Sequence, residues 1–187
     1  MDISRNNTYL LINNVIAGQT PKVIDVFYPL LKQFDLIIEI GSGRGAFWYW
    51  LHSNSKKFVS YDIDSRRNMF TDKNIDFRVG DCFDKKILSD IQMLIESHKR
   101  ILLLCDGGNK EKEFQTFAKF LKKDDVIMCH DYSDCDTYYK KLQKDINWKT
   151  RSESHYKNIL NTINLYNLEA YEYESCKNVL WGSFIKL

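Results

Sequence analysis

The segment LIIEIGSGRGAF, residues 36–47, decides the fold of this chain. It opens with an apolar run that holds a single acid, Glu39, and continues with three glycines in G-x-G-x-G spacing before a helical pattern begins. Glycine tolerates positive φ angles and lets backbone N–H groups approach a ligand, and a helix N-terminus favours an anion. The segment therefore predicts a strand, a ligand-binding turn and a helix.

Four apolar runs have the length of a strand and lack the alternation of a half-exposed one. They are LIIEI (36–40), FVSYD (58–62), ILLLCD (101–106) and VIMCHD (126–131), and a weaker run, IDFRVGD (75–81), fits between the second and the third. Strands that helices cover on both faces have this composition. Helical spacing over residues 46–51, 85–97 and 110–121 separates the runs. The order predicts five parallel strands in a doubly wound α/β sheet.

The last third of the chain has a different character. Residues 138–146 are expected to form a helix, and EAYEYES (169–175) and NVLWGSFIKL (178–187) alternate around the tripeptide 176–178, which is typical of a β-hairpin. Added to the five parallel strands, an antiparallel C-terminal hairpin predicts a mostly parallel seven-stranded sheet.

The length of 187 residues indicates a single domain. Within it we expect N-terminal helices that form a lid (1–34), a cofactor-binding core (35–132), and a C-terminal helix and hairpin (133–187). The first 19 residues have neither a basic start nor a long apolar stretch, which indicates a cytoplasmic protein with no membrane partner.

Charge and cysteine content narrow the function classes. The net charge of +2 indicates no strongly basic surface, so it does not favour a nucleic-acid partner and does not by itself exclude one. The five cysteines are widely spaced and include no C-x-x-C pair, so a structural zinc site is not expected and the thiols are expected to be reduced. The composition assigns no oligomeric state.

The glycine loop indicates which ligand it binds. A dinucleotide-binding loop has G-x-G-x-x-G spacing, whereas the third glycine here comes one residue early. Glu39 precedes Gly41 by two residues, and its charge would repel a pyrophosphate but attract a sulfonium and an ammonium group. These features favour S-adenosylmethionine as the cofactor.

Two further acids end the next two strands. Asp62 follows Glu39 by 23 residues, and Asp81 ends the weaker run. The pattern E-x-G-x-G-x-G at a strand end resembles motif I of the class I S-adenosylmethionine-dependent methyltransferases. The resemblance implies that Asp62 binds both ribose hydroxyls, with Asp64 as the alternative, and that Asp81 meets the adenine amino group. The predicted cofactor-binding residues are Glu39, Gly41, Ser42, Gly43, Gly45, Asp62, Asp81, Cys82 and Asp106.

The fourth and fifth strands end in residues that suit acceptor chemistry. Asp106 ends the fourth strand, and His130 and Asp131 end the fifth. Ligands of open α/β sheets lie at the carboxyl ends of the strands, so these three side chains are the predicted catalytic residues. Together they could hold Mg²⁺, which would lower the pKa of a bound substrate hydroxyl. The alternative is that no metal binds, and Asp106 with His130 polarises the acceptor.

The arrangement resembles metal-dependent O-methyltransferases that act on sugars, the related cephalosporin hydroxylase-like proteins, and small bacterial and phage methyltransferase-like proteins. The resemblance implies that Asp106 and Asp131 are metal ligands and that His130 replaces the first acid of a pair. In that family a catalytic histidine stands three residues after the first metal-binding aspartate. Asn109 is found there in this chain and cannot act as a general base, so His130 is the alternative base.

These observations predict an S-adenosylmethionine-dependent O-methyltransferase with a small-molecule or glycan acceptor. One alternative is a ribose 2′-O-methyltransferase of RNA. It would use a Lys-Asp-Lys-Glu tetrad drawn from Lys22, Asp106, Lys140 or Lys141, and Glu172 or Glu174. The other alternative is a cofactor-binding protein without turnover, for which Asn109 is the suggestive feature.

Overall fold

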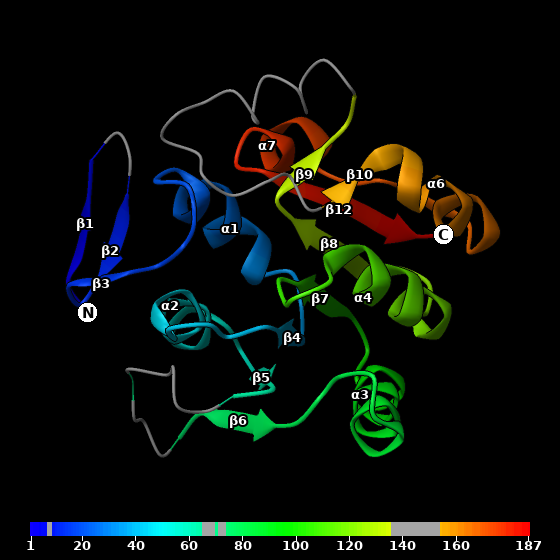
Figure 1. Ribbon diagram of the computed structural model, residues 1–187, viewed down its shortest axis with the longest axis horizontal. Coiled ribbons are helices and arrows are strands. Elements are labelled where there is room, and N and C mark those ends of the chain that lie inside the picture. The colour runs from blue at the N-terminus through cyan, green and yellow to red at the C-terminus, as the bar shows by residue number, and fades with distance from the viewer. Residues whose placement is uncertain (7–8, 65–69, 71–73, 136–153) are drawn as a thin grey trace.

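The computed structural model describes residues 1–6, 9–64, 70, 74–135 and 154–187. A seven-stranded sheet with helices on both faces forms its body, in the order β11-β12-β8-β7-β4-β5-β6 (Figure 1). The strands are β4 (Leu36–Ile40), β5 (Phe58–Asp62), β6 (Asp76–Val79), β7 (Ile101–Cys105), β8 (Val126–His130), β11 (Leu168–Ala170) and β12 (Trp181–Lys186). Only β12 runs against the others in this sheet, since it pairs antiparallel with both β8 and β11. The predicted α/β sheet, mostly parallel and seven-stranded, is confirmed.

The order of the strands fixes where a ligand can bind. From β4 the chain moves outward to β5 and β6, and it then returns to the other side of β4 to form β7 and β8. The strand order therefore reverses at β4 and β7, and open α/β sheets bind ligands at the carboxyl ends of strands beside such a reversal.

Alternate side chains of the strands supply two apolar cores. On β7, Leu102 and Leu104 belong to one core, and Leu103 and Cys105 belong to the other. Helices α1 (Val23–Leu31), α2 (Ala46–Asn54) and α7 (Tyr173–Lys177) cover the first core. Helices α3 (Lys85–Ser97), α4 (Lys110–Phe117) and α6 (Tyr156–Leu165) cover the second, and the 3₁₀ turn η2 (Ala118–Phe120) continues α4. Strands buried on both faces explain why the runs lack alternation.

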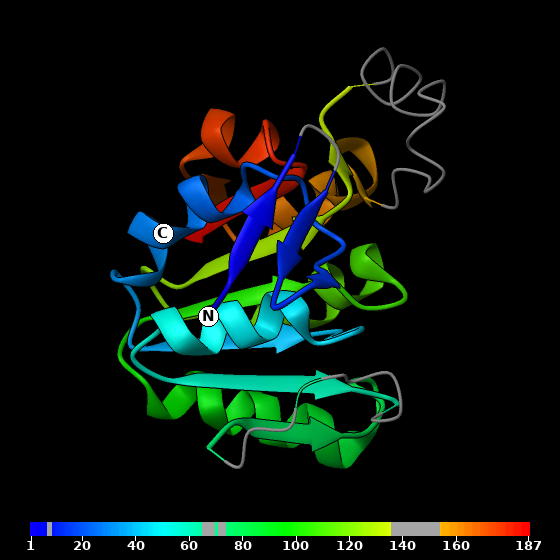
Figure 2. The same ribbon diagram turned by 90° about the vertical axis from the view of Figure 1, so that its left-hand side faces the viewer.

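The N-terminal segment differs from the expected lid of helices. Before α1 it forms a small antiparallel sheet of β1 (Ile3–Arg5), β2 (Leu10–Ile12) and β3 (Val15–Ile16), which lies on the α2 side of the molecule (Figure 2). Leu10 and Ile12 are fully buried, and Asn13 and Asn14 take positive φ angles of 48° and 63°. Two consecutive positive φ angles make the tight turn of a hairpin, for which asparagine is well suited.

The C-terminal segment confirms the antiparallel pairing but not the predicted turn. Strands β11 and β12 pair antiparallel, and the short helix α7 lies between them where a three-residue turn was expected. Glu172 and Leu180 flank α7 with positive φ angles of 47° and 67°, so the backbone turns sharply at each end of this helix. Helix α6 was not predicted, and the predicted helix 138–146 lies outside the described residues.

Two short strands extend the chain beyond the sheet. β9 (Tyr132–Ser133) pairs in parallel with β10 (Ser154–His155).

In the described part of the chain, no helix is both long and apolar enough to cross a membrane.

Candidate active site

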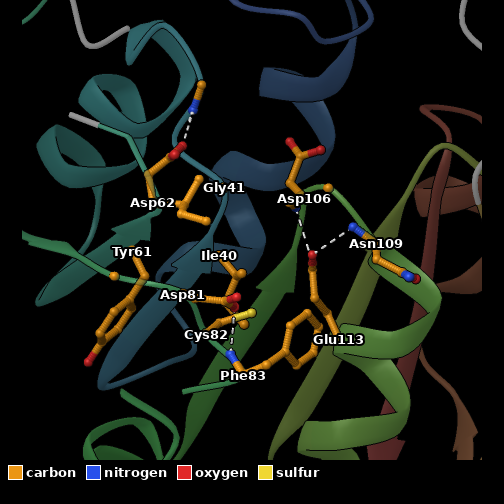
Figure 3. A pocket seen from close by; sticks show the side chains of 15 residues that line it. Ile40, Gly41, Tyr61, Asp62, Asp81, Cys82, Phe83, Asp106, Asn109 and Glu113 are labelled. Carbon is orange, nitrogen blue, oxygen red and sulfur yellow. Dashed lines mark hydrogen bonds between the residues drawn. The ribbon is translucent and has the colours of Figure 1, made fainter. Parts of the chain in front are cut away.

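A cavity of about 450 Å³ opens at the carboxyl ends of β4, β5 and β7 (Figure 3). This volume lies within the usual range for small-molecule sites. The cavity is lined by Ile40, Gly41, Gly43, Tyr61, Asp62, Ile63, Gly80, Asp81, Cys82, Phe83, Asp106, Gly107, Gly108, Asn109 and Glu113. Six of the predicted cofactor residues are among them, namely Gly41, Gly43, Asp62, Asp81, Cys82 and Asp106.

Gly41 is required where β4 passes close to the end of β7. Its φ angle is +92°, and a Cβ atom at this position would collide with the backbone of Asp106 and Gly107. Both constraints select glycine, because a side chain would be strained and would push the two strand ends apart. The first glycine of the loop therefore sets the shape of this wall of the cavity.

The Asp62 carboxylate is fixed against the glycine loop. Its Oδ2 accepts hydrogen bonds from Ser42 Oγ (3.1 Å) and from the Gly43 N–H (3.0 Å). Its Oδ1 accepts one from the N–H of Asp64 (3.0 Å). Asp62 lines the cavity whereas Asp64 does not, so the geometry favours Asp62 as the acid facing a ligand.

Glu39 is buried in β4, outside the wall of the cavity. It is 2% exposed and, within the described chain, is not part of the cavity wall. Its Oε2 accepts a hydrogen bond from Ser60 Oγ (2.7 Å), and burial raises the pKa of Glu39 well above its usual range. The direct contact between Glu39 and a cofactor that the sequence suggested therefore stays a prediction.

Ser42 and Gly45 serve the loop rather than the cavity wall. Ser42 supports Asp62 through the hydrogen bond described above, and Gly45 takes a φ angle of 87° as the N-cap of α2. A positive φ at this turn explains the third glycine of the pattern. Neither Ser42 nor Gly45 is among the described residues that line the cavity.

Asp81 and Cys82 lie together on the wall beyond β6. Asp81 Oδ1 accepts a hydrogen bond from the N–H of Phe83 (2.9 Å), which holds the turn into α3. Cys82 is buried, and burial is the main reason why the pKa of its thiol is raised to about 12. The thiol is therefore neutral. The Cys82 side chain is thus an apolar part of the wall.

Glu113 is a cavity residue that the sequence did not reveal. Its two carboxylate oxygens accept hydrogen bonds from the N–H groups of Gly107 and Asn109, both at 3.1 Å. Burial raises the pKa of Glu113 to about 7. The available signal was an acid in the first turn of a helix after a Gly-Gly turn, where a carboxylate is commonly found.

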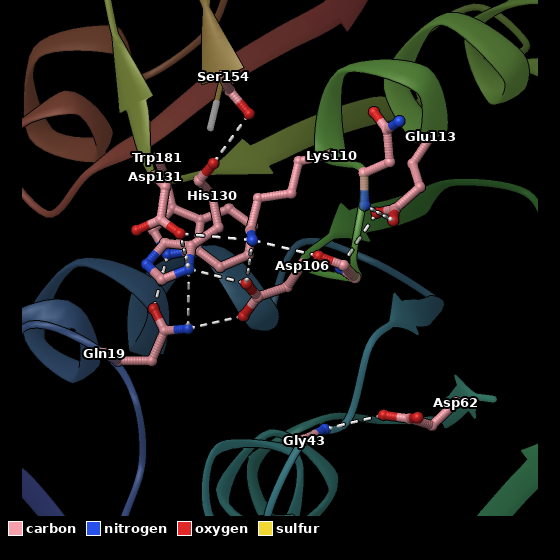
Figure 4. Close-up of polar contacts among 12 residues, drawn as sticks. Gln19, Gly43, Asp62, Asp106, Lys110, Glu113, His130, Asp131, Ser154 and Trp181 are labelled. Atoms are coloured by element: carbon pink, nitrogen blue, oxygen red, sulfur yellow. Dashed lines mark hydrogen bonds and ion pairs between the residues drawn. The ribbon is translucent and has the colours of Figure 1, made fainter. Parts of the chain in front are cut away.

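Asp106, which lines the cavity, lies beside His130 and Asp131 (Figure 4). Nδ1 of His130 lies 2.8 Å from Oδ1 of Asp106 and 3.9 Å from Oδ2 of Asp131. The His130 ring is 3% exposed and stacks on Trp181, with 4.7 Å between ring centroids. Burial alone would lower the pKa of His130, but the two neighbouring carboxylates raise it overall.

Gln19 joins this cluster from the N-terminal segment. Its Nε2 donates to Oδ2 of Asp106 (2.8 Å), and its Oε1 accepts a hydrogen bond from Nε1 of Trp181 (2.9 Å). The side chain is buried, so the segment before α1 is anchored at the cluster by a satisfied amide.

Lys110 is the second residue that the sequence did not reveal. Its Nζ lies 3.4 Å from Oδ2 of Asp131 and 4.0 Å from Oδ1 of Asp106, and it donates to the carbonyl oxygen of Gly107 (3.1 Å). The ammonium group is therefore placed between the two carboxylates that were predicted to bind a metal ion (Figure 4).

The predicted metal site does not fit this arrangement. Within the described residues, no three histidine, cysteine or acidic side chains are grouped so that they could hold a metal ion. A positive charge already stands between Asp106 and Asp131, and a divalent ion in the same place would be repelled by it.

Asn109 has a structural role that explains its presence. Its side-chain oxygen accepts a hydrogen bond from the N–H of Lys112 (3.1 Å), which makes it the N-cap of α4. Asparagine is among the preferred residues for this position. Asn109 therefore has a structural reason to stand at this position.

Known structures share this fold. No protein-family model matches the chain, and no curated protein matches its sequence. An apo structure of CmcI is 13% identical with a TM-score of 0.68, over 95% of this chain and 76% of that one. CmcI with Mg and S-adenosylmethionine is 14% identical with a TM-score of 0.64, over 98% and 78%.

A third similar structure is a geranyl diphosphate methyltransferase in complex with S-adenosylmethionine. It is 10% identical with a TM-score of 0.55, over 88% of this chain and 84% of that one. At these identities the likeness establishes the architecture. The chain has the Rossmann-like fold of the class I S-adenosylmethionine-dependent methyltransferases.

Proposed function

We propose that this protein is an S-adenosylmethionine-dependent O-methyltransferase that acts on a hydroxylated small molecule or glycan. The observation that carries the proposal is the position of Asp106. It lines the cavity that also holds Gly41 and Asp62, and it contacts the buried His130. The carboxylate of Asp106 thus connects a cofactor-sized cavity with the imidazole of His130, a side chain that can take up a proton.

The cavity wall fits the cofactor. The Asp62 carboxylate offers two acceptor oxygens on one rigid group, which matches the vicinal hydroxyls of a ribose. Gly41 allows the backbone to approach the ligand closely, and Asp81 with the backbone of Cys82 would meet the adenine. The bonds from Ser42 and Gly43 hold Asp62 in place before any ligand binds. The cofactor itself supplies an electrophilic methyl group.

The residues at the other end of the cavity would prepare the acceptor. A hydroxyl group must lose its proton when its oxygen is methylated, and Asp106 is placed to accept a hydrogen bond from it. That proton would pass to the carboxylate of Asp106, whose Oδ1 already shares a hydrogen bond of 2.8 Å with Nδ1 of His130. A positioned acid–base pair and an aligned acceptor are the two contributions that such a transfer needs.

The alternatives have less support. For RNA ribose methylation, Lys22 was expected beside Asp106, but it is exposed at the start of α1, and Lys140 and Lys141 lie outside the described residues. Among the lysines that the structure describes, Lys110 lies near Asp106. The non-catalytic alternative rested on Asn109, which caps α4.

Calorimetric titration with S-adenosylhomocysteine tests the cofactor site. We expect the wild-type protein to bind, Asp62→Asn to bind at least about tenfold more weakly, and Asp64→Asn to bind nearly as the wild type does. Asp64 is the matched control because it is the same residue type two positions away. A wild-type protein that does not bind would reject the cofactor assignment.

Methyl transfer to a panel of hydroxylated small molecules and glycans tests the reaction. The assay contains a chelator and compares the wild-type protein with Asp106→Asn. Transfer that depends on Asp106 supports the proposal. Cofactor binding without transfer to any acceptor, or transfer that Asp106→Asn leaves intact, would contradict it.

A further inference from the structure

The Lys110 ammonium is buried among negative and polar oxygens. The side chain is 7% exposed, and Nζ is near one oxygen each of Asp106, Asp131 and Gly107. Buried charges are stable only where opposite charges and hydrogen bonds compensate for lost hydration. Here the compensation comes from two carboxylates on two different strand ends, those of β7 and β8.

The helix does not explain why a lysine stands here. Lys110 is the first residue of α4, and a positive charge at a helix N-terminus is unfavourable because the backbone N–H groups there carry partial positive charge. The carboxylates of Asp106 and Asp131 must outweigh this cost. The position of the ammonium is therefore explained by the carboxylates of Asp106 and Asp131 and not by the helix.

Asp106 and Asp131 are also the ligand types that a divalent ion would choose. Mg²⁺ binds through one or two carboxylates and retains water, and Mn²⁺ accepts carboxylate and imidazole ligands. The ammonium lies between the same two carboxylates. A lysine that is fixed at this place and a divalent ion exclude one another by charge and by space.

We propose that Lys110 occupies the place of a divalent metal ion between Asp106 and Asp131 and thereby makes this protein metal-independent. Lys110 acts as a positioning residue: it holds both carboxylates and keeps a positive charge beside the end of the cavity where Asp106 faces the acceptor. This catalytic consequence rests on the proposed function, whereas the exclusion of a metal ion does not.

Mn²⁺ binding to the protein without cofactor tests the exclusion. Electron paramagnetic resonance of free Mn²⁺ counts the bound ions for the wild type, Lys110→Ala, Lys110→Arg and Lys119→Ala. We expect no binding to the wild type at millimolar Mn²⁺ and about one ion bound to Lys110→Ala, since the carboxylates of Asp106 and Asp131 then lose the ammonium between them. Lys110→Arg keeps the charge and should not bind. Lys119 is exposed on η2, so Lys119→Ala is the matched control.

Each result decides the proposal. It is overturned if the wild type binds one Mn²⁺ that Asp106→Asn removes, or if Lys110→Ala gains no ion. Circular dichroism verifies that the variants fold, and Lys110→Gln replaces the alanine variant should that one unfold. Titration with S-adenosylhomocysteine in parallel separates the two proposals, because a failure to bind it rejects the proposed function and leaves the Mn²⁺ result standing.

Discussion

Nδ1 of His130 lies 2.8 Å from Oδ1 of Asp106, although 24 residues separate them in the chain. The two side chains follow neighbouring parallel strands, β7 and β8, and parallel strands bring their carboxyl ends to one edge of the sheet. The contact is buried on the His130 side and open to the cavity on the Asp106 side. The sheet thus builds an Asp–His pair that opens to the cavity through Asp106 only.

Replacement of Gly41 should damage both the fold and the cavity. In Gly41→Ala the new Cβ meets the backbone of Asp106 and Gly107 at a positive φ angle, so we expect a loss of about 2–4 kcal/mol in the free energy of unfolding. Gly43→Ala has open space at a φ angle of +55° and should cost only about 1 kcal/mol. Urea unfolding measures the free energy of unfolding of both variants.

Gly108→Ala is the control for this pair. Gly108 lines the same cavity, and an added Cβ there has nothing within 4 Å. Its unfolding free energy should stay within about 0.5 kcal/mol of the wild type. An equal loss at Gly41 and Gly108 would show that the close approach of β4 and β7 is not the cause.

Loss of the Gln19 side chain should leave the buried Trp181 N–H without a partner and remove one hydrogen bond from the half-buried Asp106 carboxylate. In Gln19→Ala, Nε1 of Trp181 and Oδ2 of Asp106 lose the amide that joins them, so we expect a loss of about 2–4 kcal/mol and weaker methyl transfer. Gln33→Ala removes an exposed glutamine that bonds Tyr171 and should change stability little. Comparable unfolding midpoints for both variants would argue against the anchoring role of Gln19.

Glu113 should make the protein less stable as the pH rises. Its folded pKa of about 7 lies above the value of about 4.3 expected in the unfolded chain, so the folded state holds the proton more tightly. The contribution to stability is complete below pH 4 and is lost as the pH rises through 7, by about 2–3 kcal/mol between pH 5 and 8.

Glu113→Gln isolates this effect, since other groups also titrate over that range. The variant cannot ionise at this position, so the wild-type stability relative to the variant should fall between pH 5 and pH 8 in urea unfolding. A difference that does not vary with pH, or that grows in favour of the wild type, would show that the folded protein does not raise the pKa of Glu113.

Asn109 should behave as a helix cap. Asn109→Ala removes the acceptor for the Lys112 N–H and should cost about 1 kcal/mol, whereas Asn109→Ser retains a capping oxygen and should cost less. Thermal unfolding with and without S-adenosylhomocysteine measures the difference. If serine is as harmful as alanine, the cap is not what Asn109 contributes.

The strands and helices of the sheet region could be predicted well because their sequences carry local signals. The runs 36–40 and 58–62 and the helix 85–97 have the predicted bounds, since continuous apolar residues and a strong helical period leave few alternatives. The segment before α1 could not be predicted in this way. Its hairpin depends on Leu10 and Ile12 being buried against the rest of the molecule, and only the assembled core offers that contact.

The candidate site shows the same division between local signals and spatial contacts. Glycine spacing and acids at strand ends marked Gly41, Asp62 and Asp106, because the turn chemistry of a β-α unit is written into neighbouring residues. Gln19, Lys110 and Glu113 carry no such signal. Lysine and glutamate at a helix start usually face water, and only the close packing of β7, β8 and α4 shows that these two are buried.

By itself the sequence determined an α/β sheet with a glycine-rich loop at the end of β4, since strand length, glycine spacing and apolar runs are local properties. It did not determine what lies between Asp106 and Asp131. Tertiary structure decided that, by placing the Lys110 ammonium where a metal ion was expected and by taking Glu39 out of the cavity wall. The physical reason is that burial and charge pairing depend on distances between residues far apart in the chain.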